Sequence, residues 1–321
     1  MNFVDYLEAH HHVTPVSGGR QLKVSGPCPF CGEDRSDIRL YVNAETGLGD
    51  CKHCGTFFGP IKWVMAAESL SARKARALLD DEQEWFRRET GEGRCDTPAL
   101  VFPETADIEE SAEATEYLRR RHIGSEAIKH FGLSYGIADI TVPSEATPGT
   151  SERIYRTKNR IIIPIKGFDG KIDSWQGRDI TGRSKVRYLF PAGFKGAEYL
   201  YNSDTITFRP DYMVVCEGVF DALGWWQAGV RNVVATFGKK VSEPQVEILR
   251  AINPKVLFMA WDDDAAKQKY EFCERFGHLF DIRIVWLGGN DADELTKGAL
   301  ANALLEAKPY CWSDKILSAI G

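Results

Sequence analysis

The segment 213–221 reads Met-Val-Val-Cys-Glu-Gly-Val-Phe-Asp, a short apolar run that ends in a glutamate. Two later segments follow the same plan: Val-Leu-Phe-Met-Ala-Trp-Asp-Asp-Asp over 256–264, and Ile-Arg-Ile-Val-Trp over 282–286, with Asp291 and Asp293 shortly after. In parallel sheets the carboxyl ends of the strands line one crevice, where ligands bind. Acids gathered there repel one another unless a divalent cation neutralises them, and Mg²⁺ suits such a site. Phosphoryl transfer with one or two metal ions is therefore the first functional hypothesis.

The pattern around these segments predicts a doubly wound parallel sheet over residues 203–321. Strands and helices alternate there, which is typical of parallel α/β folds. The predicted strands are 212–216, 232–235, 256–260 and 282–286, and the predicted helices are 221–229, 243–252, 265–276, 299–308 and 313–320.

Cysteine pairs near the N-terminus predict a metal site of a different kind. Cys28 and Cys31 form one CxxC turn, and Cys51 and Cys54 form another. Two such turns at this separation match a closed structural site for one zinc ion; a redox pair or chance spacing is the alternative. We expect residues 1–75 to form a zinc-ribbon domain that binds DNA. Its aromatic residues either stack on unpaired bases or fill a small core: Phe57, Phe58 and Trp63.

Charge is distributed unevenly along the 321 residues, although the net charge is only −6. Residues 80–116 hold thirteen acids and three bases, and residues 76–112 are predicted to be an acidic helix and linker. Residues 153–195 hold eleven bases and three acids, so they form either a phosphate-binding surface or a set of solvated loops. Residues 113–202 are predicted to be an α+β basic subdomain with a hairpin near the Asp-Gly pair at 169–170.

Composition narrows the class of protein further. No apolar run approaches the roughly 20 residues of a membrane helix, and the first residues lack the pattern of a secretory signal. We therefore expect a cytoplasmic protein without a membrane partner, in a bacterial cell or a phage-infected host. Cysteines in a reducing compartment are expected to be thiols or metal ligands rather than disulfides.

Several further motifs stand in a recognisable order. They are Gly-Pro-Ile-Lys-Trp-Val-Met at 59–65, Tyr-Leu-Arg-Arg-Arg-His-Ile at 117–123, Asn-Arg-Ile-Ile-Ile-Pro-Ile at 159–165, Gln-Gly-Arg at 176–178, Arg-Tyr-Leu at 187–189, Phe-Lys-Gly at 194–196 and Ala-Thr-Phe-Gly at 235–238. With the cysteine pairs and the acidic segments, the chain resembles a bacterial or phage-type DNA primase. The resemblance implies a zinc ribbon, a mixed α+β basic subdomain and a TOPRIM doubly wound parallel sheet. Lys239, Lys267 and Arg187 depart from the family pattern of threonine, glycine and lysine.

The resemblance implies a nucleotidyltransferase that makes short RNA primers on single-stranded DNA. Its catalytic residues would be Glu217, Asp221, Asp262 and Asp264; its Mg²⁺ or Mn²⁺ ligands, for one or two ions, would be Glu217, Asp262, Asp264, Asp291 and Asp293. Asp263 is expected to point away from the metal site. NTP and template would be bound by Arg160, Arg178, Arg187, Lys195 and Lys239. Glu217 is either a metal ligand or the group that activates the hydroxyl.

Partners and rival functions complete the expectations. No GxxxxGK[ST] loop occurs in the sequence, so the replicative helicase implied by the resemblance is expected to be a separately encoded partner. A TOPRIM nuclease shares the acidic set and is one alternative. A non-catalytic zinc protein that binds DNA or a replisome partner is the other.

Overall fold

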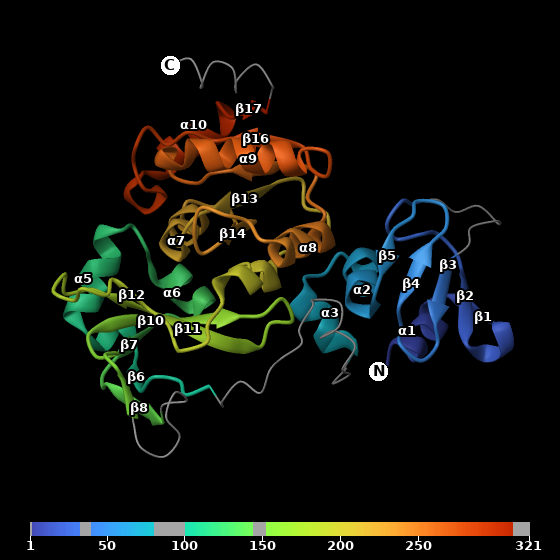
Figure 1. Ribbon diagram of the computed structural model, residues 1–321, viewed down its shortest axis with the longest axis horizontal. Coiled ribbons are helices and arrows are strands. Elements are labelled where there is room, and N and C mark those ends of the chain that lie inside the picture. The colour runs from blue at the N-terminus through green and yellow to red at the C-terminus, as the bar shows by residue number, and fades with distance from the viewer. Residues whose placement is uncertain (1, 33–39, 80–99, 144–151, 311–321) are drawn as a thin grey trace.

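The computed structural model describes residues 2–32, 40–79, 100–143 and 152–310. Within these residues the chain forms three five-stranded sheets and one two-stranded sheet. Figure 1 shows the N-terminal sheet at one end of the molecule and the other two five-stranded sheets together at the opposite end. The multi-domain α/β fold class predicted from the sequence is confirmed.

The N-terminal sheet is antiparallel, in the order β1-β2-β3-β4-β5. Its elements, with the helices that flank it, are α1 (Phe3–His10), β1 (His12–Val16), β2 (Gln21–Ser25), β3 (Leu40–Asn43), β4 (Gly49–Cys51), β5 (Phe57–Phe58), α2 (Pro60–Glu68) and α3 (Ala72–Leu79). The Asn2 side chain caps α1 by accepting a hydrogen bond from the Asp5 amide. Helix α3 crosses the predicted domain boundary at residue 75, and residues 80–99 of the predicted acidic linker lie outside the described residues.

An aromatic cluster fills the core beneath this sheet. Phe58 and Trp63 are fully buried, with ring centroids 4.9 Å apart, and Phe30 packs on Phe58 at 5.2 Å. The structure therefore places these rings in a core rather than on a base-stacking surface. Phe57, in contrast, is 59% exposed and stays on the surface.

The middle sheet is antiparallel, in the order β12-β11-β10-β7-β6. Its elements and neighbours are β6 (Thr105–Ala106), α5 (Ala112–Arg120), α6 (Ser125–Phe131), β7 (Ser134–Gly136), β8 (Ile140–Pro143), β9 (Glu152–Tyr155), β10 (Arg160–Lys166), β11 (Ile172–Asp179) and β12 (Tyr188–Leu189). The predicted hairpin is confirmed, because β10 pairs with β11 from Arg160↔Asp179 to Lys166↔Ile172. Among the described strands, β8 and β9 pair only with each other.

The C-terminal sheet has the order β14-β13-β15-β16-β17, and its first four strands are parallel. Its elements are β13 (Met213–Cys216), α7 (Val219–Gln227), β14 (Val233–Ala235), α8 (Glu243–Ile252), β15 (Leu257–Met259), α9 (Ala266–Phe276), β16 (Ile282–Ile284), α10 (Lys297–Leu305) and β17 (Lys308–Pro309). The carboxyl ends of the four parallel strands therefore meet at one edge, as the sequence predicted.

Alternate residues of β13 face two different cores. Met213 and Val215 share a core with α8, α9 and the N-terminal sheet, whereas Val214 and Cys216 share one with α7, α10, α5 and α6. Because strand side chains alternate in direction, each face of the sheet packs against a different part of the chain. The sheet is thus covered on both sides, which confirms the doubly wound architecture.

The last described strand corrects the prediction for the C-terminal end. The helix predicted over 299–308 ends at Leu305, and β17 then pairs antiparallel with β16 through Arg283↔Pro309. Proline disfavours a helical residue before it and is tolerated on an edge strand, which accounts for the change. The helix predicted at 313–320 lies outside the described residues. Among the helices described, none combines the length and the apolar character needed to cross a bilayer.

Candidate active site and metal centres

Three carboxylates converge at the carboxyl edge of the parallel sheet. Glu217 directly follows β13, and Asp262 and Asp264 follow β15, its hydrogen-bonded neighbour. One oxygen from each of the three side chains lies within 4.8 Å of the others. The structure therefore brings together three residues that the sequence marked as catalytic.

The carboxylates of this cluster repel one another, and this conflict shows in the raised pKa values of Glu217 and Asp262. Burial and the neighbouring Asp262 raise the pKa of Glu217 to about 7. Burial, together with the charges of Asp291 and Asp264, also raises the pKa of Asp262. Oε2 of Glu217 is buried and accepts no hydrogen bond from any described residue. A divalent cation with oxygen ligands would relieve this conflict, so the donor set fits Mg²⁺ or a similar ion.

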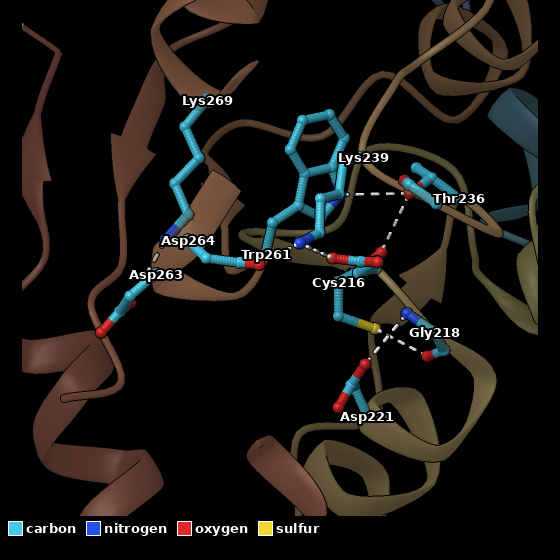
Figure 2. A network of polar contacts seen from close by, with 11 residues as sticks. Cys216, Gly218, Asp221, Thr236, Lys239, Trp261, Asp263, Asp264 and Lys269 are labelled. Atoms are coloured by element: carbon cyan, nitrogen blue, oxygen red, sulfur yellow. Dashed lines mark hydrogen bonds and ion pairs between the residues drawn. The ribbon is translucent and has the colours of Figure 1, made fainter. Parts of the chain in front are cut away.

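Lys239 supplies positive charge to this cluster. Its ammonium contacts the Asp264 carboxylate (Figure 2). The same ammonium lies 3.9 Å from Oε2 of Glu217. The loop that carries it begins at buried Thr236, whose amide donates to the Cys216 carbonyl at 3.2 Å. The indole of Trp261 donates to the Thr236 hydroxyl at 3.0 Å, which ties this loop to the segment before Asp262.

Asp221 supports the site from the first turn of α7. Its carboxylate accepts a hydrogen bond from the Gly218 amide at 2.9 Å (Figure 2). Burial, with the charges of Asp262 and Asp293, raises its pKa well above the usual range. The side chain thus holds the backbone that follows Glu217, in keeping with a supporting role.

The two acids predicted after β16 have different surroundings. Asp291 precedes a 3₁₀ turn, Ala292–Glu294, and lies near enough to Asp262 to raise its pKa. Asp293 is buried, and its carboxylate pairs with the guanidinium of Arg121 from the end of α5. Asp293 is therefore not one of the three clustered carboxylates, and its role as a magnesium ligand stays a prediction.

Arg160 is buried, and its guanidinium donates hydrogen bonds to other groups of the protein. Its guanidinium donates to the carbonyls of Arg156 at 2.6 Å, Gly177 at 3.2 Å and Val186 at 2.9 Å, and to Oγ of Ser184 at 2.8 Å. These bonds join β10 and β11 to the segment that leads to β12. These donors already have partners within the protein, so the predicted binding of phosphate by Arg160 stays a prediction.

Arg178 is also buried, in an aromatic setting. Its Nε donates to Oη of Tyr117 at 2.7 Å, and its guanidinium carbon lies 4.6 Å from the ring centroid of Tyr188 and 5.2 Å from that of Phe220. Such a guanidinium packs α5, α7 and β11 together. The structure gives it a scaffolding position rather than an exposed one.

Two of the predicted basic residues remain at the surface. Lys195 is 71% exposed, and its Nζ lies 3.1 Å from Glu198. Arg187 is exposed, with its guanidinium carbon 5.6 Å from the ring centroid of Tyr188. Both have open access to solvent, so a phosphate group can reach them.

The cysteine cluster forms the second candidate metal centre. One sulfur from each of Cys28, Cys31, Cys51 and Cys54 lies within 4.8 Å of the others. Cys28 and Cys51 are buried, and the other two face solvent. Four thiolates from two turns are the donor set of a closed, tetrahedral zinc site, so these residues fit a structural ion.

Three residues near the carboxyl edge of the parallel sheet were not predicted from the sequence. Lys269 is buried beside Asp263, Arg121 pairs with Asp293, and Gly224 lets α7 touch the 3₁₀ turn at Ala292–Glu294. Arg121 lies within the 117–123 motif, which marked the helix but not the partner. The sequence carries no comparable signal for the other two.

Comparison with known proteins first defines the class of the C-terminal domain. Residues 214–295, which include Glu217, Asp262, Asp264 and Asp291, match the family described as Toprim-like. The fold and the acidic cluster thus belong to a Toprim-like domain.

Sequence relatives then identify the larger group. The chain is 24% identical to the DNA primase of Clostridium acetobutylicum over 314 residues, covering 85% of this chain and 52% of that protein. It is 28% identical to the DNA primase of Legionella pneumophila over 344 residues, covering 94% of this chain and 59% of that protein. The chain is therefore similar over most of its length to bacterial DNA primases, and it spans about half the length of these curated relatives.

Solved structures agree on the fold. The zinc-binding and RNA polymerase domains of the Aquifex aeolicus primase match with a TM-score of 0.52 and 21% identity, over 97% of this chain and 84% of that one. The RNA polymerase domain of the Mycobacterium tuberculosis primase, in complex with a double-stranded DNA oligomer with a 6-nucleotide overhang, matches with a TM-score of 0.51 and 18% identity. That match covers 62% of this chain and 74% of that one.

Proposed function

We propose that this protein is a DNA primase that joins ribonucleotides on a single-stranded DNA template. The observation that carries the proposal is the convergence of Glu217, Asp262 and Asp264 at the carboxyl edge of a Toprim-like sheet. The relationship to bacterial DNA primases over most of the chain supports the same activity.

In the proposed reaction, a ribonucleotide 3′-hydroxyl attacks the α-phosphate of a second NTP, and pyrophosphate leaves. Glu217, Asp262, Asp264 and the nearby Asp291 would hold one or two Mg²⁺ or Mn²⁺ ions. When bound, such ions stabilise negative charge on the attacking and leaving oxygens. Both roles open to Glu217, metal ligand and proton acceptor, need its carboxylate in the ionised form.

The basic residues that face solvent near this edge would bind the triphosphate and the template backbone. Lys239 is already at the acidic cluster, and Lys195 and Arg187 are exposed on segments of the middle subdomain. Lysine offers phosphate a point charge, and arginine offers a planar, bidentate contact. Buried Arg160 and Arg178 would act indirectly, by holding the strands that carry these residues.

The cysteine cluster would hold one structural zinc ion, and the ribbon around it would contact unpaired template bases. Exposed Phe57 offers a stacking surface for such a contact. A separately encoded replicative helicase would be the protein partner, and the reaction would take place in the cytoplasm. The predicted division at residues 75, 112 and 202 remains our proposal for the domain boundaries.

The test is synthesis of radiolabelled RNA oligomers by the purified protein on random-sequence single-stranded DNA with Mg²⁺ and NTPs. Glu217→Gln and Asp262→Asn each remove one clustered carboxylate with little change in volume, and we expect product to fall at least about a hundredfold. Matched controls are Glu247→Gln and Asp211→Asn, because both acids are exposed and pair with lysine or arginine elsewhere.

The possible results separate the proposal from its rivals. Unchanged synthesis in both site variants would overturn the assignment of the acidic cluster. Strand cleavage without any NTP-dependent product would indicate a nuclease. DNA binding without metal-dependent chemistry would indicate a binding module.

A further inference from the structure

Asp263 lies between two clustered carboxylates in the sequence but faces away from them. Figure 2 shows its carboxylate pointing away from Asp264 and Lys239. Its Oδ1 accepts a hydrogen bond from the amide of Leu287 at 3.0 Å, and its Oδ2 accepts one from the amide of Gly289 at 2.8 Å. One side chain from the loop after β15 is therefore bonded twice to the loop after β16.

A buried lysine completes this contact. The side chain of Lys269, on α9, is 0% exposed, and its Nζ lies 3.5 Å from Oδ1 of Asp263. The same ammonium donates to the Val285 carbonyl at 2.9 Å and lies 4.2 Å from the ring centroid of Trp286. Burying an ammonium is costly unless it is paired, so this lysine is committed to Asp263 and the end of β16.

The loop after β16 is anchored by buried Leu287 and then turns through two glycines. Gly288 and Gly289 both have positive φ angles, 67° and 79°, in a stretch without regular secondary structure. The Asn290 side chain donates to carbonyls of the same loop, those of Leu287 and Gly288. Asp263 thus supplies hydrogen bonds that tie this loop to the loop carrying Asp262 and Asp264.

We propose that Asp263 and Lys269 form a clasp that positions Asp291 beside Glu217, Asp262 and Asp264 for cation binding. Neither clasp residue is a metal ligand; both are positioning residues. Asp291 follows directly after the clasped loop, so a shift of Leu287 and Gly289 would move its carboxylate relative to the other three. This inference rests on the proposed metal-dependent function, which needs the four acids to act together.

The test measures Mn²⁺ binding by electron paramagnetic resonance, without NTP or DNA, so that it does not depend on catalysis. Asp263→Asn removes the charge but keeps the shape of the side chain. The double variant Asp263→Leu with Lys269→Met replaces the pair with apolar groups of similar volume, which folded proteins often tolerate. We expect roughly tenfold or more weaker Mn²⁺ binding in both variants, with circular dichroism spectra like that of the parent.

A double-mutant cycle distinguishes positioning from general destabilisation. Asp291→Asn alone should weaken Mn²⁺ binding, and adding Asp263→Asn to it should weaken binding no further, because the clasp acts through Asp291. The control pair, Asp211→Asn with Lys255→Met, removes an exposed ion pair and should leave Mn²⁺ binding unchanged.

Several outcomes would overturn the clasp: parental Mn²⁺ affinity in both clasp variants, additive losses in the cycle, or failure of both variants to fold. Primer synthesis is measured separately. A protein that binds Mn²⁺ in a clasp-dependent manner but makes no RNA would refute the proposed polymerase activity and leave the clasp standing.

Discussion

The cysteine cluster and the acidic cluster both gather groups that repel one another when ionised, but they are built in opposite ways. The cysteine cluster takes all four donors from two tight turns, which is a complete tetrahedral set. The acidic cluster takes three carboxylates from two strand ends and has Lys239 as its close positive charge among the described residues. A site complete in itself stabilises a fold, whereas an incomplete one leaves positions for substrate.

The largest effect is expected when the cysteine cluster loses one of its four sulfurs. Cys51→Ser removes a buried sulfur, and we expect bound zinc to fall from one ion per chain to near zero, with loss of order in the N-terminal sheet. Structural zinc ions contribute on the order of 10 kcal/mol in small metal-binding modules. Mass spectrometry of bound zinc and circular dichroism measure the two effects.

Cys273→Ser is the matched control, because Cys273 is equally buried in α9 and is not part of the cysteine cluster. It should keep its zinc while losing some stability. A full complement of zinc in the Cys51 variant would show that this site does not need four sulfurs, and the contrast with the acidic cluster would then disappear.

A smaller effect is expected at the contact between α7 and the 3₁₀ turn that contains Asp293. A Cβ atom at Gly224 would lie 2.8 Å from Cα of Asp293 and 2.9 Å from its amide nitrogen. Gly224→Ala must therefore push the turn away, at about 1–3 kcal/mol of stability. Urea unfolding measures this cost, and Mn²⁺ binding should weaken at the same time because Asp291 precedes the turn.

Gly298→Ala provides the contrast, since a Cβ atom there meets nothing within 4 Å in the first turn of α10. It should be neutral or stabilise by up to about 1 kcal/mol. Equal destabilisation by both alanines would show that loss of glycine, rather than the close approach to Asp293, accounts for the cost.

Local patterns in the sequence predicted the parts of both sites that depend on neighbours along the chain. Short apolar runs ending in acids gave the parallel strands and the clustered Glu217, Asp262 and Asp264, and the CxxC spacing gave the four cysteines. The surroundings of the other predicted residues depend on contacts far apart in the sequence. Arg160 was identified by its charge, but the carbonyls that use its donors lie on β11 and the segment before β12.

The direction and burial of side chains were the other properties that the sequence pattern could not predict. Asp291 and Asp293 are the same residue type at nearby positions, so the sequence does not distinguish them. In the structure Asp293 pairs with Arg121, which is distant in the sequence. Lysine is normally exposed on a helix, so the burial of Lys269 could not be read from the pattern of α9. Strand β17 is too short to have a periodicity, and pairing with β16 alone defines it.

The pH dependence of stability tests the conflict within the acidic cluster. Folding raises the pKa of Glu217 from 4.5 to about 7, so the folded chain holds more protons than the unfolded chain between these values. The unfolding free energy of the protein without Mg²⁺ should therefore fall as pH rises from about 5 to about 7. Thermal melts across this range, with zinc retained, measure the slope.

Glu217→Gln should flatten this slope, since its amide does not titrate, and the difference between the two proteins isolates the one carboxyl group. Added Mg²⁺ should also reduce the slope, because a cation favours the ionised form. Identical slopes in parent and variant would mean that neither burial nor the charge of Asp262 raises the pKa of Glu217.

The smallest effect concerns Lys239, which provides positive charge where a metal ion would. Its ammonium contacts Asp264 and lies 3.9 Å from Glu217, so it competes with a cation for the same oxygens. Lys239→Met should therefore strengthen Mn²⁺ binding about two- to fivefold, the range of a partly exposed ion pair. In the proposed reaction the same variant should raise the KM for NTP, because the lysine would contact the triphosphate.

Lys240→Met is the control for this last experiment, because Lys240 is exposed and forms no ion pair with a described residue. It should leave Mn²⁺ binding within the error of the measurement. Weaker binding in the Lys239 variant would reverse the interpretation: the lysine would then order the carboxylates for the ion rather than compete with it. In that case Lys239 would be a permanent part of the acidic site. The acidic site would then be more complete in itself, as the cysteine site is.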